Sequence, residues 1–264
     1  MTHTQMASES RTDVIAGRNP VREALERGDG RIEKVLLQRG VHGSAIDAIR
    51  QAAKAIGVPV QMVPQPKVDR VAPKANHQGV VALAAPIAYA DLDEMLARIA
   101  PSLDAVKATK PVLVVLDGVE DPHNFGAILR SAVACGASGV LVPTTHMAPL
   151  SAVAIKASAG AALQIPIART SHLPEALHQL KERGYWVAGL DGSDGRGPEQ
   201  QTVWAYDWDR AVAVVVGSEG RGMHPSVRSA CDVRLEIPIR GPVESLNASV
   251  AAGIALFAAV RERA

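Results

Sequence analysis

The chain has few aromatic residues, few cysteines and no long apolar run. Aromatic residues make up 3% of its 264 residues, which excludes an RNA-binding surface made of rows of stacked aromatic rings. No apolar run reaches the roughly 18 residues that a membrane-spanning helix requires. Residues 1–12 are polar and lack the apolar segment of a signal peptide. We therefore expect a disordered tail at residues 1–12 and a cytoplasmic protein.

The two cysteines, Cys135 and Cys231, are far apart and have no neighbours at metal-ligand spacing. This excludes a disulfide framework and indicates a reducing compartment. Small or apolar residues flank both cysteines, which favours packing in a core as their role. No other cluster of residues has metal-ligand spacing, and we expect no bound metal.

The charge of the chain is nearly balanced, with a formal net charge of +1 at pH 7. Residues 1–86 carry 12 Lys and Arg residues against 8 Asp and Glu residues. This mild excess suggests that the N-terminal part contacts a polyanion. Ordinary variation of surface charge explains the excess equally well, so both interpretations stay open.

Apolar residues make up 47% of the chain, a composition that suits buried parallel strands covered by helices. Residues 13–87 alternate between strand and helix patterns. The first helix has Asn19 as its expected N-cap with Pro20 after it, and the second has Ser44 as its expected N-cap and Gly57 as its stop. Strands are expected at residues 32–38, 58–63 and 79–86, and helices at residues 19–26 and 44–57. These elements predict a small α/β domain.

Residues 88–110 are expected to form a linker that is partly helical, with LDEMLARIA as a candidate short helix. Residues 111–264 open with the apolar run PVLVVLDGV, which is typical of a buried parallel strand. Further strands are expected at residues 139–143, 165–169, 185–191, 211–217 and 233–239, and helices at residues 124–137, 151–163, 173–184, 225–231 and 245–264. This alternation predicts a mostly parallel sheet with helices on both faces.

Open parallel sheets bind ligands beyond the carboxyl ends of their strands, and three such ends carry unusual residues. The first is DGVEDPHNFGAILR, in which Asn124 lies at the start of a helix and Arg130 lies in its middle. An ordinary N-cap, worth about 1 kcal/mol, would explain Asn124 without any function. A solvent-exposed position would equally explain Arg130.

The second end is VVVGSEGRG, residues 214–222, where glycines surround Glu219 after a buried strand. The glycines predict a close approach of the backbone to a ligand, although a tight turn explains them as well. The loop lacks the GK[ST] ending of a phosphate-binding loop, and its glycines do not have the spacing of a dinucleotide fingerprint. This argues against a metabolic enzyme that binds a dinucleotide.

The third end is IPIRGPVESLNASVAAG, residues 237–253, in which Ser245 to Asn247 are expected to open the last helix. Ser245 has the residue type of an N-cap. Asn247 is a poor helix former for the first turn, which suggests a chemical role. A helix N-terminus also favours a negatively charged group of a substrate.

The patterns DPxNxGAILRxA, VVGSEGxG and IPIxGxVESLNxSVA resemble, in this order, the three motifs of the SpoU (TrmH) family of RNA 2′-O-ribose methyltransferases. The resemblance covers about residues 110–264, and no motif residue is missing. The stretches GRNPVREAL and HQGVVAL resemble the substrate-binding domain that precedes the catalytic domain in many members. The whole chain is most similar to the branch that methylates a guanosine in 23S ribosomal RNA.

The resemblance implies a SPOUT-type α/β catalytic domain at residues 111–264, with a mostly parallel sheet and a C-terminal trefoil knot. It implies an N-terminal RNA-binding α/β domain at residues 13–87, of the ribosomal-protein-L30e-like type. It also implies a homodimer that uses S-adenosylmethionine as its cofactor. The expected cofactor contacts are Gly217, Ile237 and Leu246, with neighbouring backbone from Ser218, Pro238 and Ile239.

The resemblance assigns the central catalytic role to Arg130. A guanidinium is almost always protonated, so we expect Arg130 to hold the ribose or its phosphate and to stabilise the alkoxide. A strongly perturbed environment would keep the role of a base open. Asn124 is expected to orient Arg130 or the ribose, and Glu219 to orient Arg130 or a backbone donor. Ser245 and Asn247 complete this shell, and a second subunit could supply part of it.

The N-terminal domain is expected to select the RNA. Arg18, Arg22 and Lys74 are candidate phosphate contacts, although solvated surface charge is the better interpretation of any one of them. Two other functions stay open, namely the same reaction on transfer RNA and an RNA-binding assembly factor that has the fold without catalysis. The intact motif residues argue against the second of these.

Overall fold

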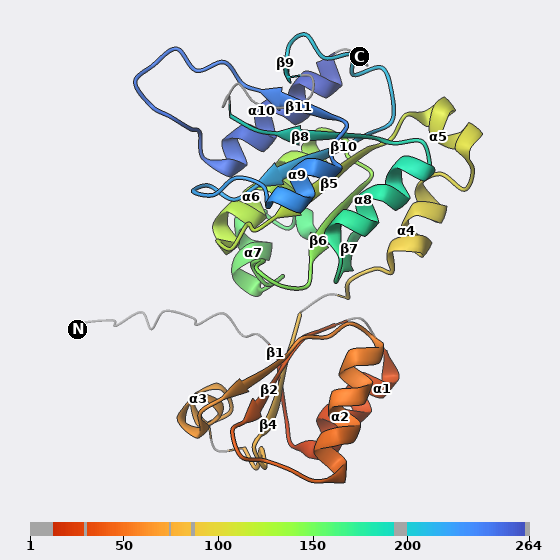
Figure 1. The fold of residues 1–264 in the computed structure, drawn as a ribbon. Helices are drawn as coiled ribbons and strands as arrows, with labels where there is room; N and C mark the ends of the chain where they lie inside the picture. The colour runs from red at the N-terminus through yellow and green to blue at the C-terminus, as the bar shows by residue number, and fades with distance from the viewer. Residues whose placement is uncertain (1–12, 29–30, 74, 86–87, 193–199, 262–264) are drawn as a thin grey trace, which may run out of the picture. The chain divides into compact units, whose positions relative to one another are not determined.

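The computed structural model of the chain describes residues 13–28, 31–73, 75–85, 88–192 and 200–261 (Figure 1). The expected tail and Lys74 lie outside these residues. The chain divides into two compact units. The first unit is Met1–Ile87 with Leu150–Val153, and the second is Ala88–Pro149 with Ala154–Ala264.

The first unit consists of a four-stranded sheet and three helices. Its strands are β1 (Asp13–Ala16), β2 (Ile32–Gln38), β3 (Val60–Val63) and β4 (Val80–Ala84), and its helices are α1 (Arg18–Arg27), α2 (Ser44–Ala55) and α3 (Gln65–Val71). The strand order is β1-β4-β2-β3, in which β2 and β3 are parallel and the other pairs are antiparallel. The strands β2, β3 and β4 and the helices α1 and α2 confirm the predictions. β1 and α3 were not predicted, because short segments have too few residues to establish a period.

Helices cover both faces of this sheet (Figure 1). Successive residues of a strand point to opposite faces. Val35 and Leu37 of β2 pack in one core with α1 and α2, and Leu36 between them packs with α3 on the other face. The first unit therefore has an apolar core on each side of its sheet.

Both predicted helices of the first unit begin earlier than expected. Gly17 precedes α1 and Gly43 precedes α2, with φ of 106° and 116°, values that residues with a side chain rarely adopt. Asn19 is therefore inside α1, and Ser44 is the first residue of α2. Pro20 is tolerated in the first turn because the N–H that it lacks has no partner there.

The second unit consists of a seven-stranded sheet with helices on both sides. Its strands are β5 (Val112–Asp117), β6 (Gly139–Pro143), β7 (Ile167–Thr170), β8 (Trp186–Leu190), β9 (Gln200–Thr202), β10 (Val212–Gly217) and β11 (Val233–Glu236). Its helices are α4 (Leu92–Ile99), α5 (Leu103–Thr109), α6 (Pro122–Ala134), α7 (Ala152–Ala157), η1 (Ala161–Leu163, a 3₁₀ helix), α8 (Leu173–Glu182), α9 (Pro225–Ala230) and α10 (Ala248–Arg261). The order β7-β6-β5-β10-β8-β11-β9 joins only parallel neighbours, which confirms the predicted parallel sheet.

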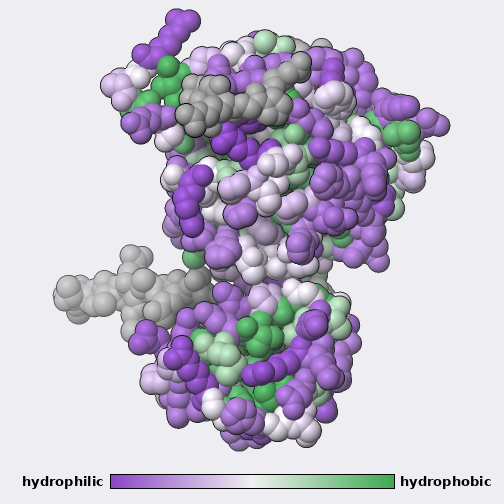
Figure 2. All heavy atoms as spheres, in the orientation of Figure 1, coloured by the Kyte–Doolittle hydropathy of each residue, from purple (hydrophilic) through white to green (hydrophobic). Residues whose placement is uncertain are grey.

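Two layers of helices enclose this sheet (Figure 1). Residues of α4, α5, α8 and α9 share one core with the sheet. α6 and α10 pack against each other, and α10 also contacts β10 and β8. Figure 2 shows that polar side chains cover much of the visible surface of each unit. No helix within the described ranges is long and apolar enough to cross a membrane.

The expected linker at residues 88–110 is part of the second unit. Met95 and Leu96 of α4 and Val106 of α5 are each 2% exposed or less and belong to the core. The prediction of a linker was wrong because the helices are short and their burial depends on a sheet that follows them in sequence.

The carboxyl ends of the central strands bring the three unusual loops to one edge of the sheet. Asp117 at the end of β5 pairs in register with Gly217 at the end of β10. β8 separates β10 from β11, which leads into the third loop. The last helix begins at Ala248, and not at Ser245 as expected. The trefoil knot stays a prediction of the resemblance.

Candidate functional site

The loop after β10 is a tight hairpin that holds Glu219 at its tip. The Ser218 N–H donates to the Gly222 carbonyl at 3.0 Å, and the Gly222 N–H donates back to the Ser218 carbonyl at 2.9 Å. Gly217 has no room for a side chain, because a Cβ atom there would overlap the backbone at Gly222. Gly217 is therefore needed for the path of the backbone.

Three side chains, one from each loop, form a polar cluster at this edge. Asn124 Nδ2 donates to Glu219 Oε1 at 2.6 Å. Asn247 Nδ2 donates to the same carboxylate oxygen. It also donates to Asn124 Oδ1, at a distance of 3.1 Å. The structure thus brings together three of the five predicted catalytic residues, which lie up to 123 positions apart in the chain.

Asn247 is oriented by its position as the N-cap of α10. Its Oδ1 accepts hydrogen bonds from the N–H groups of Ser249 at 2.9 Å and Val250 at 3.4 Å. Because the oxygen faces the helix, the amide nitrogen faces Glu219. The reasoning that Asn247 had no capping role was wrong, since the helix starts after it.

Asn124 is not the N-cap of its helix. The cap of α6 is Asp121, whose Oδ1 accepts from the His123 N–H at 2.8 Å. Asn124 lies one turn into the helix and is only partly exposed. Its side chain is therefore free from capping and is used in the cluster.

The hairpin lines two cavities of different composition. The larger has a volume of about 390 Å³, and its lining includes Leu190, Asp191, Gly217, Ser218, Glu219, Arg221, Leu235, Ile237, Ile239, Glu244, Ser245 and Leu246. The smaller has a volume of about 280 Å³ and is lined by Gly118, Val119, Glu120, Asp121, Asn124, Ser218, Glu219, Gly220, Arg221 and Ala248. Glu219 lines both cavities and therefore lies at their common wall.

Five of the six predicted cofactor residues line the larger cavity, and Pro238 is the exception. Pro238 is exposed. Ser245 also lines the larger cavity and is not part of the polar cluster. Its place in the shell around the hydroxyl and the methyl donor stays a prediction.

Arg130 lies apart from the cluster that it was expected to join. It is exposed and lines neither cavity. Arg130 follows Asn124 by six residues of α6, which separates them by about 9 Å along the helix axis and turns them to different faces. Within one chain, Asn124 and Glu219 therefore orient each other and Asn247, and they do not orient Arg130.

The candidate phosphate contacts in the first unit have partners within the chain. Arg18 Nε donates to the Gln78 carbonyl at 3.3 Å, and Arg22 forms an ion pair with Glu26 at 3.7 Å. His77 accepts from the Gly79 N–H at its Nδ1 and contacts Asp69 through its Nε2 at 2.8 Å. These contacts tie α1 and α3 to the turn before β4.

Both thiols are unsuited to nucleophilic chemistry at neutral pH. Burial raises the pKa of Cys231 to about 12 and the pKa of Cys135 to about 11. Cys231 is 8% exposed and packs in the core of the second unit, as predicted. Within the described ranges, no group of three or more His, Cys, Asp or Glu residues could hold a metal ion.

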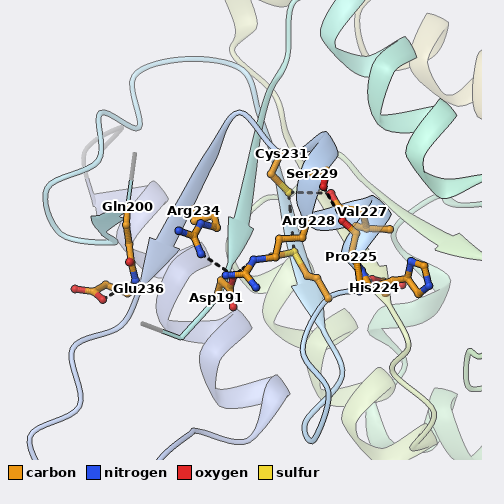
Figure 3. A network of polar contacts seen from close by, with 12 residues as sticks. Asp191, Gln200, His224, Pro225, Val227, Arg228, Ser229, Cys231, Arg234 and Glu236 are labelled. Carbon is orange, nitrogen blue, oxygen red and sulfur yellow. Dashed lines mark hydrogen bonds and ion pairs between the residues drawn. The ribbon is translucent and has the colours of Figure 1, made fainter. Parts of the chain in front are cut away.

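Sequence reasoning missed a charged network at the end of β8 (Figure 3). Asp191 forms ion pairs with Arg228 and Arg234 and lines the larger cavity. A signal for it exists in the sequence, because Leu-Asp-Gly follows a buried strand at residues 116–118 and again at residues 190–192.

Known proteins match the chain along most of its length. Residues 111–257 match the model of the SpoU rRNA Methylase family, and residues 14–90 match a model described as RNA 2′-O ribose methyltransferase substrate binding. A protein of Staphylococcus haemolyticus, whose name assigns it to the TrmH family of tRNA/rRNA methyltransferases, is 40% identical over 250 residues. This match covers 95% of our chain and 96% of the relative.

Solved structures share the fold. The SpoU methyltransferase AviRb from Streptomyces viridochromogenes, crystallised with AdoMet, has a TM-score of 0.57 at 23% identity and covers 95% of our chain and 90% of its own. The TrmH/SpoU tRNA modifying enzyme of A. aeolicus has a TM-score of 0.53 at 27% identity, and the match covers 61% of our chain and 82% of that enzyme.

The α/β architecture with an N-terminal substrate-binding unit and a parallel C-terminal sheet is thereby confirmed. The catalytic family model spans residues 111–257, more than half of the chain, and its three motifs meet at one edge of the sheet. The chain therefore belongs to the SpoU family of RNA methyltransferases.

Proposed function

We propose that this chain uses S-adenosylmethionine to methylate a ribose 2′-hydroxyl of RNA, and that its target is a guanosine in 23S ribosomal RNA. The observation that carries the proposal is the cluster of Asn124, Glu219 and Asn247 at the wall between two cavities. Group transfer between two bound nucleosides needs a donor cavity, an acceptor cavity and polar groups at their boundary.

The composition of the larger cavity suits the cofactor. Ile237, Ile239 and Leu246 provide an apolar wall for an adenine ring. The charged lining consists of three carboxylates and one guanidinium, which favours a sulfonium cation over the phosphates of a dinucleotide. When bound there, S-adenosylmethionine would supply the electrophilic methyl group, and Glu219 is part of the lining of the cavity that would hold it.

The composition of the smaller cavity suits a guanosine. Its charged lining is Glu120, Asp121, Glu219 and Arg221, and Arg221 also forms a 3.7 Å ion pair with Glu120. Carboxylates accept hydrogen bonds and repel phosphate. Guanine offers two adjacent N–H donors on one edge, whereas adenine and cytosine offer an amino group beside a ring acceptor. A carboxylate-rich cavity therefore supports a guanine base over adenine and cytosine.

The polar cluster would prepare the hydroxyl for transfer. Asn124 and Asn247 both donate to Glu219 Oε1. Within the described residues Glu219 Oε2 accepts no hydrogen bond, so this oxygen is available to orient the ribose hydroxyl. A ribose hydroxyl is a poor nucleophile at neutral pH, and a cation must stabilise the alkoxide as it forms. We assign that role to Arg130.

Arg130 would reach the acceptor from a second subunit. It is exposed and distant from the cluster of its own chain. α10 packs beside α6 and exposes Val250 and Phe257, which are 49% and 54% exposed and lie on one face because they are seven residues apart. Such an apolar stripe is characteristic of an interface. We therefore propose a homodimer in which Arg130 of each subunit completes the site of the other.

The first unit would select the RNA, and the second would carry out the methyl transfer. We assign α4 and α5 to this second, catalytic unit. Residues 14–90 match a substrate-binding model, which supports this division. Ribosomal RNA as the substrate implies a cytoplasmic protein. Arg18 and Arg22 are weaker candidates for phosphate contacts than before, because each has an intramolecular partner.

A transfer RNA target is the second candidate. The names of the relatives from Staphylococcus haemolyticus and A. aeolicus both include transfer RNA. The test is mass mapping of ribose methylation in ribosomal and transfer RNA from cells with and without the gene. Loss of one methyl at a 23S guanosine is the expected result. Loss on transfer RNA would overturn the target, and no loss at all would contradict the enzymatic proposal in favour of a non-catalytic assembly factor.

A further inference from the structure

The carboxylate that follows β8 is held in place from two sides. Asp191 Oδ2 accepts from Arg228 Nε at 2.7 Å and lies 3.4 Å from Arg234 Nη1. Arg228 belongs to α9 and Arg234 to β11, and Figure 3 shows both guanidinium groups pointing toward Asp191. The Asp191 N–H donates to the Leu235 carbonyl at 3.0 Å, so its backbone is fixed as well.

This network is partly buried and is costly to form, although the side chain of Arg228 is 34% exposed. The side chain of Arg234 is 3% exposed and that of Asp191 is 18% exposed. Removing charged groups from water costs several kcal/mol per ion, and an ion pair offsets this cost only if its geometry is good. Two guanidinium groups beside one carboxylate restrict the movement of Asp191.

The other oxygen of Asp191 is left for a ligand. Both arginines contact Oδ2, and among the described residues nothing donates a hydrogen bond to Oδ1. Asp191 lines the larger cavity together with Ile237, Ile239 and Leu246. The oxygen is accessible from the cavity, since Asp191 is only partly buried, and a ligand with hydroxyl groups could donate to it.

We propose that Asp191 accepts a hydrogen bond from a ribose hydroxyl of the nucleoside cofactor, and that Arg228 and Arg234 are positioning residues for its carboxylate. This inference rests on the proposed function, which makes a nucleoside the occupant of the larger cavity. The apolar side chains suit the base, and the carboxylate at the strand end suits the diol, because a ribose presents two adjacent O–H donors and a carboxylate only accepts.

The test is calorimetric binding of S-adenosylhomocysteine and of its 2′-deoxy and 3′-deoxy forms to the full-length protein. The wild-type protein should bind at least one deoxy form about tenfold more weakly than the parent compound. Asp191→Asn should bind the parent about tenfold more weakly and should lose that preference between parent and deoxy form. Arg228→Met should reduce the preference in part, because the carboxylate is less well held.

Glu236→Gln is the matched control, since Glu236 lies near the network but accepts from Gln200 at 2.9 Å and does not line the cavity. It should bind all three compounds like the wild type. Equal binding of the three compounds by the wild-type protein would overturn the inference, whether or not Asp191→Asn folds. The same weakening of all three by Asp191→Asn would assign Asp191 a purely structural role. No binding of S-adenosylhomocysteine by the wild type would instead refute the proposed cofactor.

Discussion

Asn247 donates a hydrogen bond to Glu219 from the same amide group whose oxygen caps α10. The cap fixes which end of the amide faces the carboxylate, so the start of the last helix and the geometry of the polar cluster depend on one residue. Substitutions at this position can separate the two roles, because aspartate keeps the oxygen and loses the N–H donors.

Asn247→Asp should leave stability close to that of the wild type and reduce kcat/KM by about 100-fold. Aspartate is as good an N-cap as asparagine, but it would place a second carboxylate against Glu219. Thermal unfolding and methyl transfer to RNA are the two measurements. Asn247→Ala is the comparison, and it should also lose about 1 kcal/mol of stability because the cap is removed. Normal turnover by the aspartate variant would exclude a role for the amide nitrogen.

Arg130→Ala should abolish methyl transfer while RNA binding and thermal stability stay near the wild-type values, since the side chain is exposed. If Arg130 acts in the site of the partner subunit, mixing this variant with Glu219→Ala should restore activity. In an equal mixture half of the dimers are mixed and each has one intact site, so about a quarter of the wild-type activity is expected. An inactive mixture, with subunit exchange verified, would contradict action between subunits.

Leu246→Asp should raise the dissociation constant of S-adenosylmethionine by about 100-fold, because a carboxylate replaces part of the apolar wall of the larger cavity. Leu246→Ala should have a smaller effect. Calorimetry gives the dissociation constants, and circular dichroism verifies that both variants are folded. Unchanged affinity of the aspartate variant would mean that the cofactor binds elsewhere.

Gly217→Ala should destabilise the protein by about 1–3 kcal/mol and impair cofactor binding. The added Cβ atom would overlap the backbone of Gly222, so the hairpin and both cavities must shift. Gly220→Ala is the control in the same hairpin, since a Cβ atom there has no neighbour within 4 Å. Urea unfolding of the two variants measures the difference, and equal stabilities would refute this account of the motif glycines.

Cys231 should make the protein less stable in alkaline solution. Burial raises its pKa to about 12 in the folded chain, from the ordinary value of 9.0 that applies to the unfolded chain. Above pH 9 the unfolded thiol loses its proton while the folded thiol keeps it, so stability falls with pH up to about 12, by at most about 1.4 kcal/mol per pH unit. The unfolding free energy should therefore fall between pH 8 and pH 10.5, and this fall should be larger in the wild type than in Cys231→Ala. The same decrease in both proteins would exclude the thiol as the cause.

Much of the catalytic fold could be predicted from the sequence, because parallel strands buried on both faces are continuous apolar runs. The runs VLVVLD at residues 112–117 and VAVVVG at residues 212–217 need no tertiary information to be recognised as buried strands. The cofactor residues Ile237 and Leu246 were likewise predicted by their motif, and they line the larger cavity.

Contacts between distant segments could not be predicted in this way. The burial of Met95 depends on a sheet whose strands come later in the chain. The distance of Arg130 from Glu219 depends on the hairpin and on the face of α6 that meets α10. The ion pairs of Asp191 depend on α9 and β11, which bring two arginines to it.

The sequence by itself determined the alternation of strands and helices and the three motifs, because these depend on the period and type of neighbouring residues. The tertiary structure decided which side chains meet, where the last helix starts, and which carboxylate has a free oxygen beside a cavity. These features depend on hydrogen bonds and ion pairs between residues up to 123 positions apart in the chain. Such pairs leave no periodic signal in the sequence, because each partner by itself resembles an ordinary surface residue.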